Sequence, residues 1–299
     1  MLSSFCGSWK IVDDHDETVE NFLKKPVFLR GIAAKHNETG KIITGSAADF
    51  SQERSYVRAL GELKERIVTV NKVKPHKIGK FSYSLSNGVA SHYDLSIAKK
   101  NAFIELIERD VVLRSWYGEL PKKIISESID YFPFDFDIRV LEFPEVISHF
   151  GSIFTTGILA SVPDENRFLF AFSSGSSRSL ALEKAILEAT QRYLFSPPES
   201  TPYTLSQIPS IEDHFEFYNR KQGFESLWEW SYDVLLDIPP VIYEDNSKFQ
   251  ILFSENTTSE KFFVVRAIDP ELWPLTFGIS HPRVHSKKIN SKRLLHPFA

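Results

Sequence analysis

One short pattern occurs three times in this chain and constrains its fold more than any other feature. Each copy reads Ala-x-x-Glu-x-x-(Glu/Gln)-Arg, and the copies begin at Ala59, Ala102 and Ala185. Apolar residues around the copies recur with the spacing of an α-helix. A pattern repeated at this level indicates structural units that are related to one another.

A predicted strand and a glycine precede each copy. Gly45 and Gly88 lie 17 residues before the first glutamate of their copies, and Gly175 lies 13 residues before Glu188. We therefore predict three units that each consist of a strand, a glycine loop and a helix. Helices are expected over residues 51–70, 95–117 and 179–194, with Asp94 as the N-cap of the second.

Apolar runs elsewhere predict further strands, among them a β-hairpin around the turn Pro163–Asn166. No low-complexity linker divides the chain, so we expect one α/β domain of mixed sheets and helices over residues 1–299. Its N-terminal segment, residues 1–25, carries the acidic cluster Asp13–Asp16, which we expect to be a solvated terminus. Residues 286–299 are expected to form an extended tail.

The repeated motif places two oxygen-bearing side chains on one helix face. Residues i and i+3 share a face, and two carboxylates there repel each other unless a cation joins them. Two such helices facing each other suit Mg²⁺, which prefers oxygen ligands and brings phosphates with it. The candidate metal and nucleotide ligands are Glu62, Glu65, Glu105, Glu108, Glu188 and Gln191.

An arginine ends each copy of the motif. Arg66, Arg109 and Arg192 are candidates to meet phosphate oxygens, or to neutralise the glutamates instead. A single Glu-x-x-Glu-Arg is most often a solvated helix face. Glu105 and Glu188, however, interrupt apolar runs, where a carboxylate costs stability unless it is paired or metal-bound. Three copies therefore favour a site.

The composition argues against several classes of function. Charged residues make up 25% and the formal net charge is −4, so bulk electrostatics do not favour a nucleic-acid partner. One cysteine, Cys6, cannot form an internal disulfide. No stretch of about 18 apolar residues predicts a membrane span. We expect a cytoplasmic protein with neither nucleic-acid nor membrane partners.

Several motifs, taken in order, resemble those of the YcaO family. The segment Ser86–Ala90 with the helix around Glu105 and Glu108 is similar to the family's Ser-Asn-Gly loop and Glu-rich helix. The other two copies resemble its remaining nucleotide motifs, and Val265–Leu275 resembles its late strand and proline element. The similarity runs from about residue 27 to the end. It implies a YcaO-type domain that binds ATP and Mg²⁺ without a P-loop, and the chain has no G-x-x-x-x-G-K-[ST].

The resemblance also implies a reaction. In azoline-forming members, a Cys, Ser or Thr side chain of a peptide attacks the preceding backbone carbonyl. ATP phosphorylates the resulting oxygen, and phosphate leaves to give the ring. Ser86 and Asn87 are then expected to contact the nucleotide, and the carboxylate of Ala299, or His296, to act as general base. The chain departs from the family at Ala59, often Ser, and at Ala299, usually Pro.

The same resemblance implies partners and leaves alternatives open. A ribosomally made precursor peptide is the expected substrate, with a separate ThiF-like protein that binds its leader peptide and a flavin dehydrogenase as a further candidate partner. Thioamide or amidine formation would use the same ATP site. A non-catalytic subunit that holds a peptide or partner is the alternative of another class. His281 and His285 have the spacing of a metal pair, but an exposed loop is the better interpretation.

Overall fold

The structure is a computed structural model that describes most of the chain. The described residues are 8–20, 25–74, 77–78, 81–126, 136–162, 167–195, 210–218, 220–232, 237–244, 246–256, 261–277, 281–283 and 295–298. Contacts divide the chain into two compact units, which we describe separately. Unit 1 comprises Met1–Lys74, Gly88–Phe103 and Lys248–Ile268, and unit 2 comprises Pro75–Asn87, Ile104–Ser247 and Asp269–Ala299. The expectation of a single domain stays a prediction.

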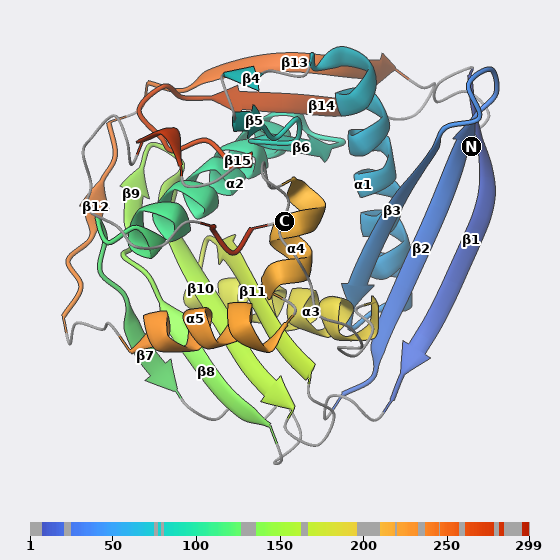
Figure 1. Cartoon of the computed structure of the whole chain (residues 1–299). Helices are drawn as coiled ribbons and strands as arrows, with labels where there is room; N and C mark the ends of the chain where they lie inside the picture. Colours follow the sequence, from blue (N-terminus) through green and yellow to red (C-terminus); the bar gives the residue numbers. More distant parts are fainter. Residues whose placement is uncertain are drawn as a thin grey trace. The chain divides into compact units, whose positions relative to one another are not determined.

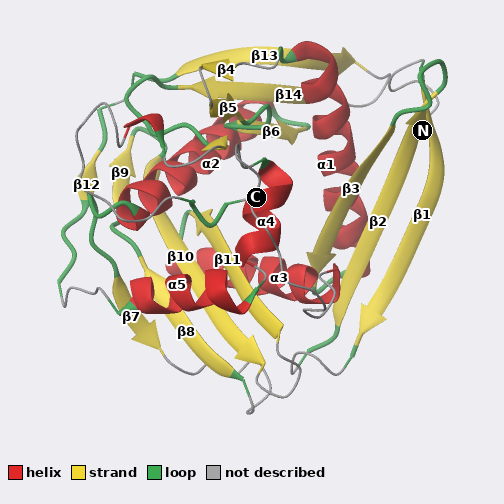
Figure 2. Ribbon diagram, in the orientation of Figure 1, coloured by secondary structure: helices red, strands yellow, loops and turns green. Residues whose placement is uncertain are grey.

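Unit 1 contains two antiparallel three-stranded sheets (Figure 1). The first has the order β1 (Trp9–Val19), β2 (Val27–His36) and β3 (Ile42–Asp49). Helix α1 (Gln52–Lys72) packs against β3 and β2, as Figure 2 shows. The second sheet has the order β13 (Lys248–Asn256), β14 (Lys261–Ile268) and β6 (Val89–His92). Residues Ile32, Ala34, Ile43, Ala47, Ala59, Leu63 and Ile67 form the core between α1 and the first sheet.

Unit 2 is built around a six-stranded sheet. Its path is β12 (Val241–Ile242), β9 (Val146–Ser148), β10 (Gly151–Val162), β8 (Asp137–Glu142) and β7 (Lys123–Ser126), and β11 (Arg167–Gly175) also pairs with β10. Helix α3 (Arg178–Phe195) packs on β10 and β11. A small sheet joins β15 (Thr276–Phe277), β5 (Phe81–Tyr83) and β4 (Lys77–Ile78). The remaining helices are α4 (Ile211–Tyr218), α5 (Lys221–Ser231) and α2 (Leu95–Trp116), which begins in unit 1 and continues in unit 2.

The predicted mixed α/β fold and its three strand–helix repeats are present. β3 leads into α1, β6 into α2 and β11 into α3, each across two residues. The predicted hairpin is the antiparallel pair β10–β11, whose register runs from Val162↔Arg167 to Phe154↔Gly175. The turn Pro163–Asn166 lies outside the described residues.

The three repeats are in phase when they are counted from their helix caps. Ser51, Asp94 and Ser177 each accept a hydrogen bond from the backbone N–H three residues later, as N-caps do. In every repeat the motif alanine lies eight residues after the cap and the first glutamate eleven. Each motif alanine is fully buried, so each glutamate occupies the same place on its helix: Ala59, Ala102 and Ala185.

The prediction that each motif glycine lies in a loop is wrong for two of the three. Gly45 lies inside β3, where a Cβ would come within 2.4 Å of the backbone of Ala59 and Leu63 in α1. Gly175 is the last residue of β11. Gly88 alone lies in a turn, with a φ of 68° that favours glycine. Gly45 is therefore needed for close packing of helix on strand.

The acidic cluster near the N-terminus is exposed to solvent, as expected, but it lies in a strand instead of a loose terminus. Asp13–Asp16 lie in β1 and pair in register with residues 30–33 of β2. Arg30 donates to Asp14 at 2.6 Å and lies 3.6 Å from Asp16. These ion pairs across the strands offset the repulsion between neighbouring carboxylates, which makes the acidic strand compatible with the sheet.

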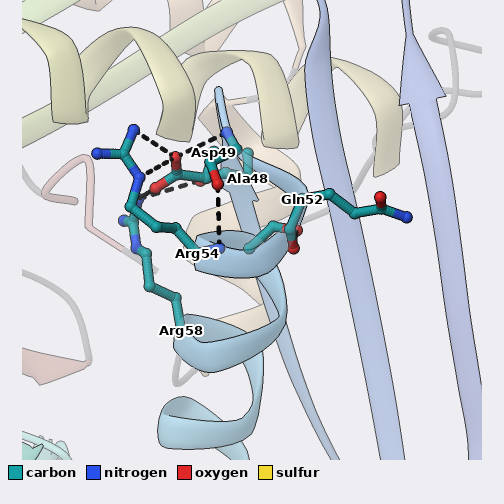
Figure 3. A network of polar contacts seen from close by, with 7 residues as sticks. Ala48, Asp49, Gln52, Arg54 and Arg58 are labelled. Carbon is teal, nitrogen blue, oxygen red and sulfur yellow. Dashed lines mark hydrogen bonds and ion pairs between the residues drawn. The ribbon is translucent and has the colours of Figure 1, made fainter.

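One buried carboxylate joins the end of β3 to the start of α1 (Figure 3). Asp49 is only 4% exposed and accepts hydrogen bonds from the Ser51 N–H, Arg54 Nε and Arg58 Nη1. Arg58 also donates to the carbonyl oxygen of Ala48. Asp49 thereby holds the cap and the first two turns of α1 to the strand that precedes them.

Candidate functional site

The same ion pair occurs in all three copies of the motif. The first glutamate of each copy binds the arginine four residues later, at 2.7 Å for Glu62–Arg66, 2.6 Å for Glu105–Arg109 and 3.4 Å for Glu188–Arg192. The motif arginines therefore neutralise the glutamates in this structure. The second side chain of each copy, Glu65, Glu108 or Gln191, is not part of that pair.

The unit 1 copy lines a pocket of about 340 Å³. Oxygen Oε2 of Glu62 also accepts a hydrogen bond from the Ser46 N–H of β3, and Arg66 donates to the Thr44 carbonyl. These contacts fix the Glu62–Arg66 pair against the strand. Residues from α1, β6, α2 and β14 complete the pocket: Val57, Arg58, Leu60, Gly61, Glu62, Lys64, Glu65, Ser91, His92, Tyr93, Asn101 and Phe262.

The two copies in unit 2 lie near each other. The pKa of Glu108 on α2 is raised to about 8, chiefly by removal from water and also by the negative charge of Glu188 on α3. The charges of Lys184 and Arg109 act in the opposite direction. Helices α2 and α3 thus bring the two motif carboxylates close enough for the charge of one to affect the pKa of the other.

This group of residues fits a divalent cation with a phosphate. A cation between Glu108 and Glu188 would relieve the repulsion that raises the Glu108 pKa. Nitrogen Nη1 of Arg109 is buried and has no hydrogen-bond partner in the described part of the chain. A guanidinium N–H in that state suits a phosphate oxygen. Within the same described ranges, no three His, Cys, Asp or Glu side chains form a cluster ready to hold a metal ion.

Sequence reasoning missed Lys184, which belongs to this group. It donates to the Ser174 carbonyl at 3.0 Å and lies one helical turn before Glu188 on α3. Its charge lowers the pKa of Glu108. The spacing of four residues from a motif glutamate was the signal that could have identified it.

The predicted nucleotide loop is held by its own side chains. Oδ1 of Asn87 accepts a hydrogen bond from the Leu275 N–H at 3.1 Å, and the hydroxyls of Ser84 and Ser86 are 3.2 Å apart. The side-chain oxygen Oδ1 of Asn87 is therefore used within the fold. A contact with the nucleotide stays a prediction, and it would be made by the side-chain nitrogen Nδ2 of Asn87 and the Ser86 hydroxyl.

The interpretation of His296 as a general base is contradicted by its hydrogen bonds. Its ring is fully buried, Nε2 contacts the Thr276 carbonyl, and Nδ1 accepts a hydrogen bond from the Phe298 N–H. Burial lowers the pKa of His296 well below its usual range. Neither nitrogen is available to take a proton from a substrate. Ala299, the other candidate base, lies outside the described residues.

His281 is buried, contrary to the exposed loop expected for it. Its ring is 0% exposed and stacks on Trp273 with centroids 4.7 Å apart. Nε2 contacts the Pro274 carbonyl at 2.8 Å and Nδ1 accepts from the Arg283 N–H. Both nitrogens are used in the fold. His285, the second member of the considered pair, lies outside the described residues.

Comparison with known proteins identifies the class to which this fold and site belong. A family model described as YcaO cyclodehydratase, ATP- and Mg²⁺-binding, matches residues 66–238, which is more than half of the chain. The chain belongs to the YcaO family. Glu62 and Glu65 lie just before the matched range. A search of curated proteins found no match.

Solved structures share the fold at low sequence identity. A chain of the E. coli microcin synthetase McbBCD complex has a TM-score of 0.57 and 13% identity, with 88% of each chain covered. YcaO from Methanopyrus kandleri, bound with AMPPCP and Mg²⁺, has a TM-score of 0.52 and 11% identity, with 86% of this chain and 84% of that chain covered. A heterocyclase in complex with substrate and cofactor has a TM-score of 0.53 and 14% identity, with 82% and 48% covered. Across the described residues of this chain, no helix is both long and apolar enough to span a membrane.

Proposed function

We propose that this protein activates backbone amides of a peptide with ATP, and that its reaction is cyclodehydration of Cys, Ser or Thr residues to azolines. The observation that carries the proposal is the group of motif carboxylates on α2 and α3. Glu108 and Glu188 repel each other there, beside a buried arginine nitrogen with no partner in the described part of the chain. That arrangement occurs in a chain whose family is described as binding ATP and Mg²⁺.

The protein's own residues would bind and orient the nucleotide. In unit 2, the candidate oxygen ligands for Mg²⁺ are Glu105, Glu108, Glu188 and Gln191. In unit 1, Glu62 and Glu65 are candidate ligands of the same chemistry. Arg109 and Lys184 neutralise phosphate charge, and fixed donors of this kind lower a barrier because they need no rearrangement during the reaction. Bound Mg·ATP would supply the phosphoryl group that turns a poor leaving oxygen into a good one.

The partners form part of the same proposal. The structural neighbours include McbBCD with pro-MccB17 bound, a complex of several proteins with a peptide substrate. We therefore propose that this chain acts on a precursor peptide together with a ThiF-like leader-binding protein, and that a flavin dehydrogenase oxidises the rings. The tail completes the site in this proposal, with the Ala299 carboxylate as general base, and the cytoplasmic location stays a prediction.

The test measures nucleotide binding and ring formation separately. Calorimetry with a non-hydrolysable ATP analogue should show binding that requires Mg²⁺. Glu108→Gln and Glu188→Gln should weaken it tenfold or more, whereas Glu183→Gln, which lies on the same helix α3 but about 140° around its axis from Glu188, should bind as the original chain does. No Mg²⁺-dependent binding, with and without the partner, would reject the proposal.

Ring formation is then followed by mass spectrometry, as the loss of one water per ring. Deleting Leu295–Ala299 should lower the rate by about 10²–10⁴, the range for a lost general base, while nucleotide affinity stays the same. If the chain binds Mg·ATP and the peptide gains sulfur or an amine instead of only losing water, the reaction is thioamide or amidine formation and not azoline formation. Binding of peptide without any turnover would identify a non-catalytic subunit.

A further inference from the structure

The segment Leu295–Phe298 is buried and held through its backbone. The carbonyl oxygen of Leu295 accepts hydrogen bonds from Trp116 Nε1 at 2.7 Å and from the Tyr218 hydroxyl at 2.8 Å. The next carbonyl, that of His296, bonds to His214 Nδ1 at 3.0 Å. Three side chains thus bind two consecutive carbonyls, and all three are at most 1% exposed.

The three side chains come from two helices of unit 2. Trp116 is the last residue of α2, and His214 and Tyr218 lie one turn apart on α4, beside the C-terminal end of the chain (Figure 1). The rings of Trp116 and Tyr218 meet edge to face with centroids 5.9 Å apart. Those of His214 and His296 lie 4.4 Å apart. Ring packing thus orients Trp116 and Tyr218 against each other, and His214 against the segment.

Helix α2 connects this segment to the carboxylate group. Arg109 precedes Trp116 by seven residues, which is close to two turns, so the two side chains lie on one face of α2. The charge of Arg109 also reaches His296. The segment therefore lies along the face of α2 that carries the motif arginine.

We propose that Trp116, His214 and Tyr218 are positioning residues for the tail. They form a clamp on the Leu295 and His296 carbonyls that fixes residues 295–298 along the face of α2 that carries Arg109. The inference rests on the proposed function for its effect on turnover. The clamp itself is a feature of the described residues and is testable without turnover.

The experiment compares variants of the full chain that differ by one donor. Tyr218→Phe removes a hydroxyl, and His214→Leu removes the ring donor. His214→Asn keeps an N–H near the position of Nδ1 and serves as the conservative rescue. Tyr243→Phe is the matched control, because it removes a half-buried hydroxyl that donates to Asp269 in the same unit.

Two measurements are made on each variant. Amide hydrogen exchange of the peptide containing residues 295–298 should be at least tenfold faster in Tyr218→Phe and His214→Leu, and close to the original in His214→Asn and Tyr243→Phe. Ring formation should show a kcat at least tenfold lower in the first pair, with unchanged KM for peptide and unchanged Mg·ATP affinity.

The outcomes separate the clamp from the proposed function. Unchanged exchange in Tyr218→Phe and His214→Leu would overturn the clamp. Faster exchange with an unchanged kcat would overturn its role in positioning, as would equal losses in His214→Leu and His214→Asn. If the original chain binds no Mg·ATP, the proposed function fails, and the exchange measurements alone decide whether the clamp exists.

Discussion

Gly45 in β3 lies directly against Leu63 in α1. A Cβ atom on Gly45 would come within 2.4 Å of the Leu63 backbone nitrogen, far closer than two such atoms approach. Leu63 is 1% exposed and belongs to the core between α1 and the first sheet. The absence of a side chain at residue 45 therefore sets how closely the first motif helix can approach its strand.

Gly45→Ala should destabilise the protein by about 3 kcal/mol, because the added methyl group meets backbone atoms that cannot turn aside. Gly31→Ala is the matched control, since Gly31 pairs with Ser46 next to Gly45 and a Cβ there meets nothing within 4 Å. Urea denaturation of both variants measures the difference. Equal stability of the two would show that α1 shifts without cost.

Asp49→Ala should cost about 2–3 kcal/mol, because it removes the buried acceptor of the Ser51 N–H and of two arginine side chains. Arg54→Ala should cost less than about 1 kcal/mol, since its side chain is 61% exposed and Arg58 still pairs with Asp49. Thermal unfolding of the two variants checks the ranking. A larger loss in Arg54→Ala would contradict the central role given to the carboxylate.

The sequence predicted the three repeated helices because their signals are local. Caps, apolar spacing and the motif itself all lie within one element, and Ser51, Asp94 and Ser177 cap the helices in the structure. Counting from the glycines obscured the common register, since glycine serves packing at Gly45 and a turn at Gly88. The constant distance from cap to glutamate was present in the sequence and describes the repeat better.

Features that depend on partners distant in sequence were not predictable in this way. Residues 13–16 were assigned to a terminus because their charges hide the strand, which is held by pairing with β2 and by ion pairs to Arg30. His296 looked available because no local pattern reveals that Thr276 and His214 surround it. Burial of a polar side chain is decided by tertiary contacts, so the site residues most difficult to judge were the histidines.

Glu108→Gln should raise the stability of the ligand-free protein while weakening Mg·ATP. Desolvation and Glu188 raise the pKa of Glu108 to about 8, so at neutral pH this carboxyl must take up a proton when the chain folds, whereas an amide needs none. Differential scanning calorimetry should show a higher Tm for the variant without ligand and a smaller rise in Tm on adding Mg·ATP. The reverse pattern would show that Glu108 is a structural residue.

Burial of His281 makes the free energy of unfolding depend on pH. Burial lowers its pKa to about 4, whereas an unfolded chain has a histidine pKa of about 6.5. The folded protein therefore keeps His281 neutral while the unfolded chain takes up a proton as the pH falls below 6.5. His281 thus favours folding above pH 6.5, and that contribution is lost as the pH falls toward 4, by about 3 kcal/mol in total.

Asp110, whose pKa burial raises to about 6, acts in the opposite direction, so the pH dependence of the original chain alone cannot isolate the effect of the histidine. His281→Gln keeps an N–H for the Pro274 carbonyl and cannot titrate, and Asp110 and His296 are present in both proteins. The free energy of unfolding, measured in urea from pH 7 to pH 4.5, should fall more steeply in the original chain than in the variant. Parallel curves would mean that His281 binds a proton equally well in the folded and unfolded states.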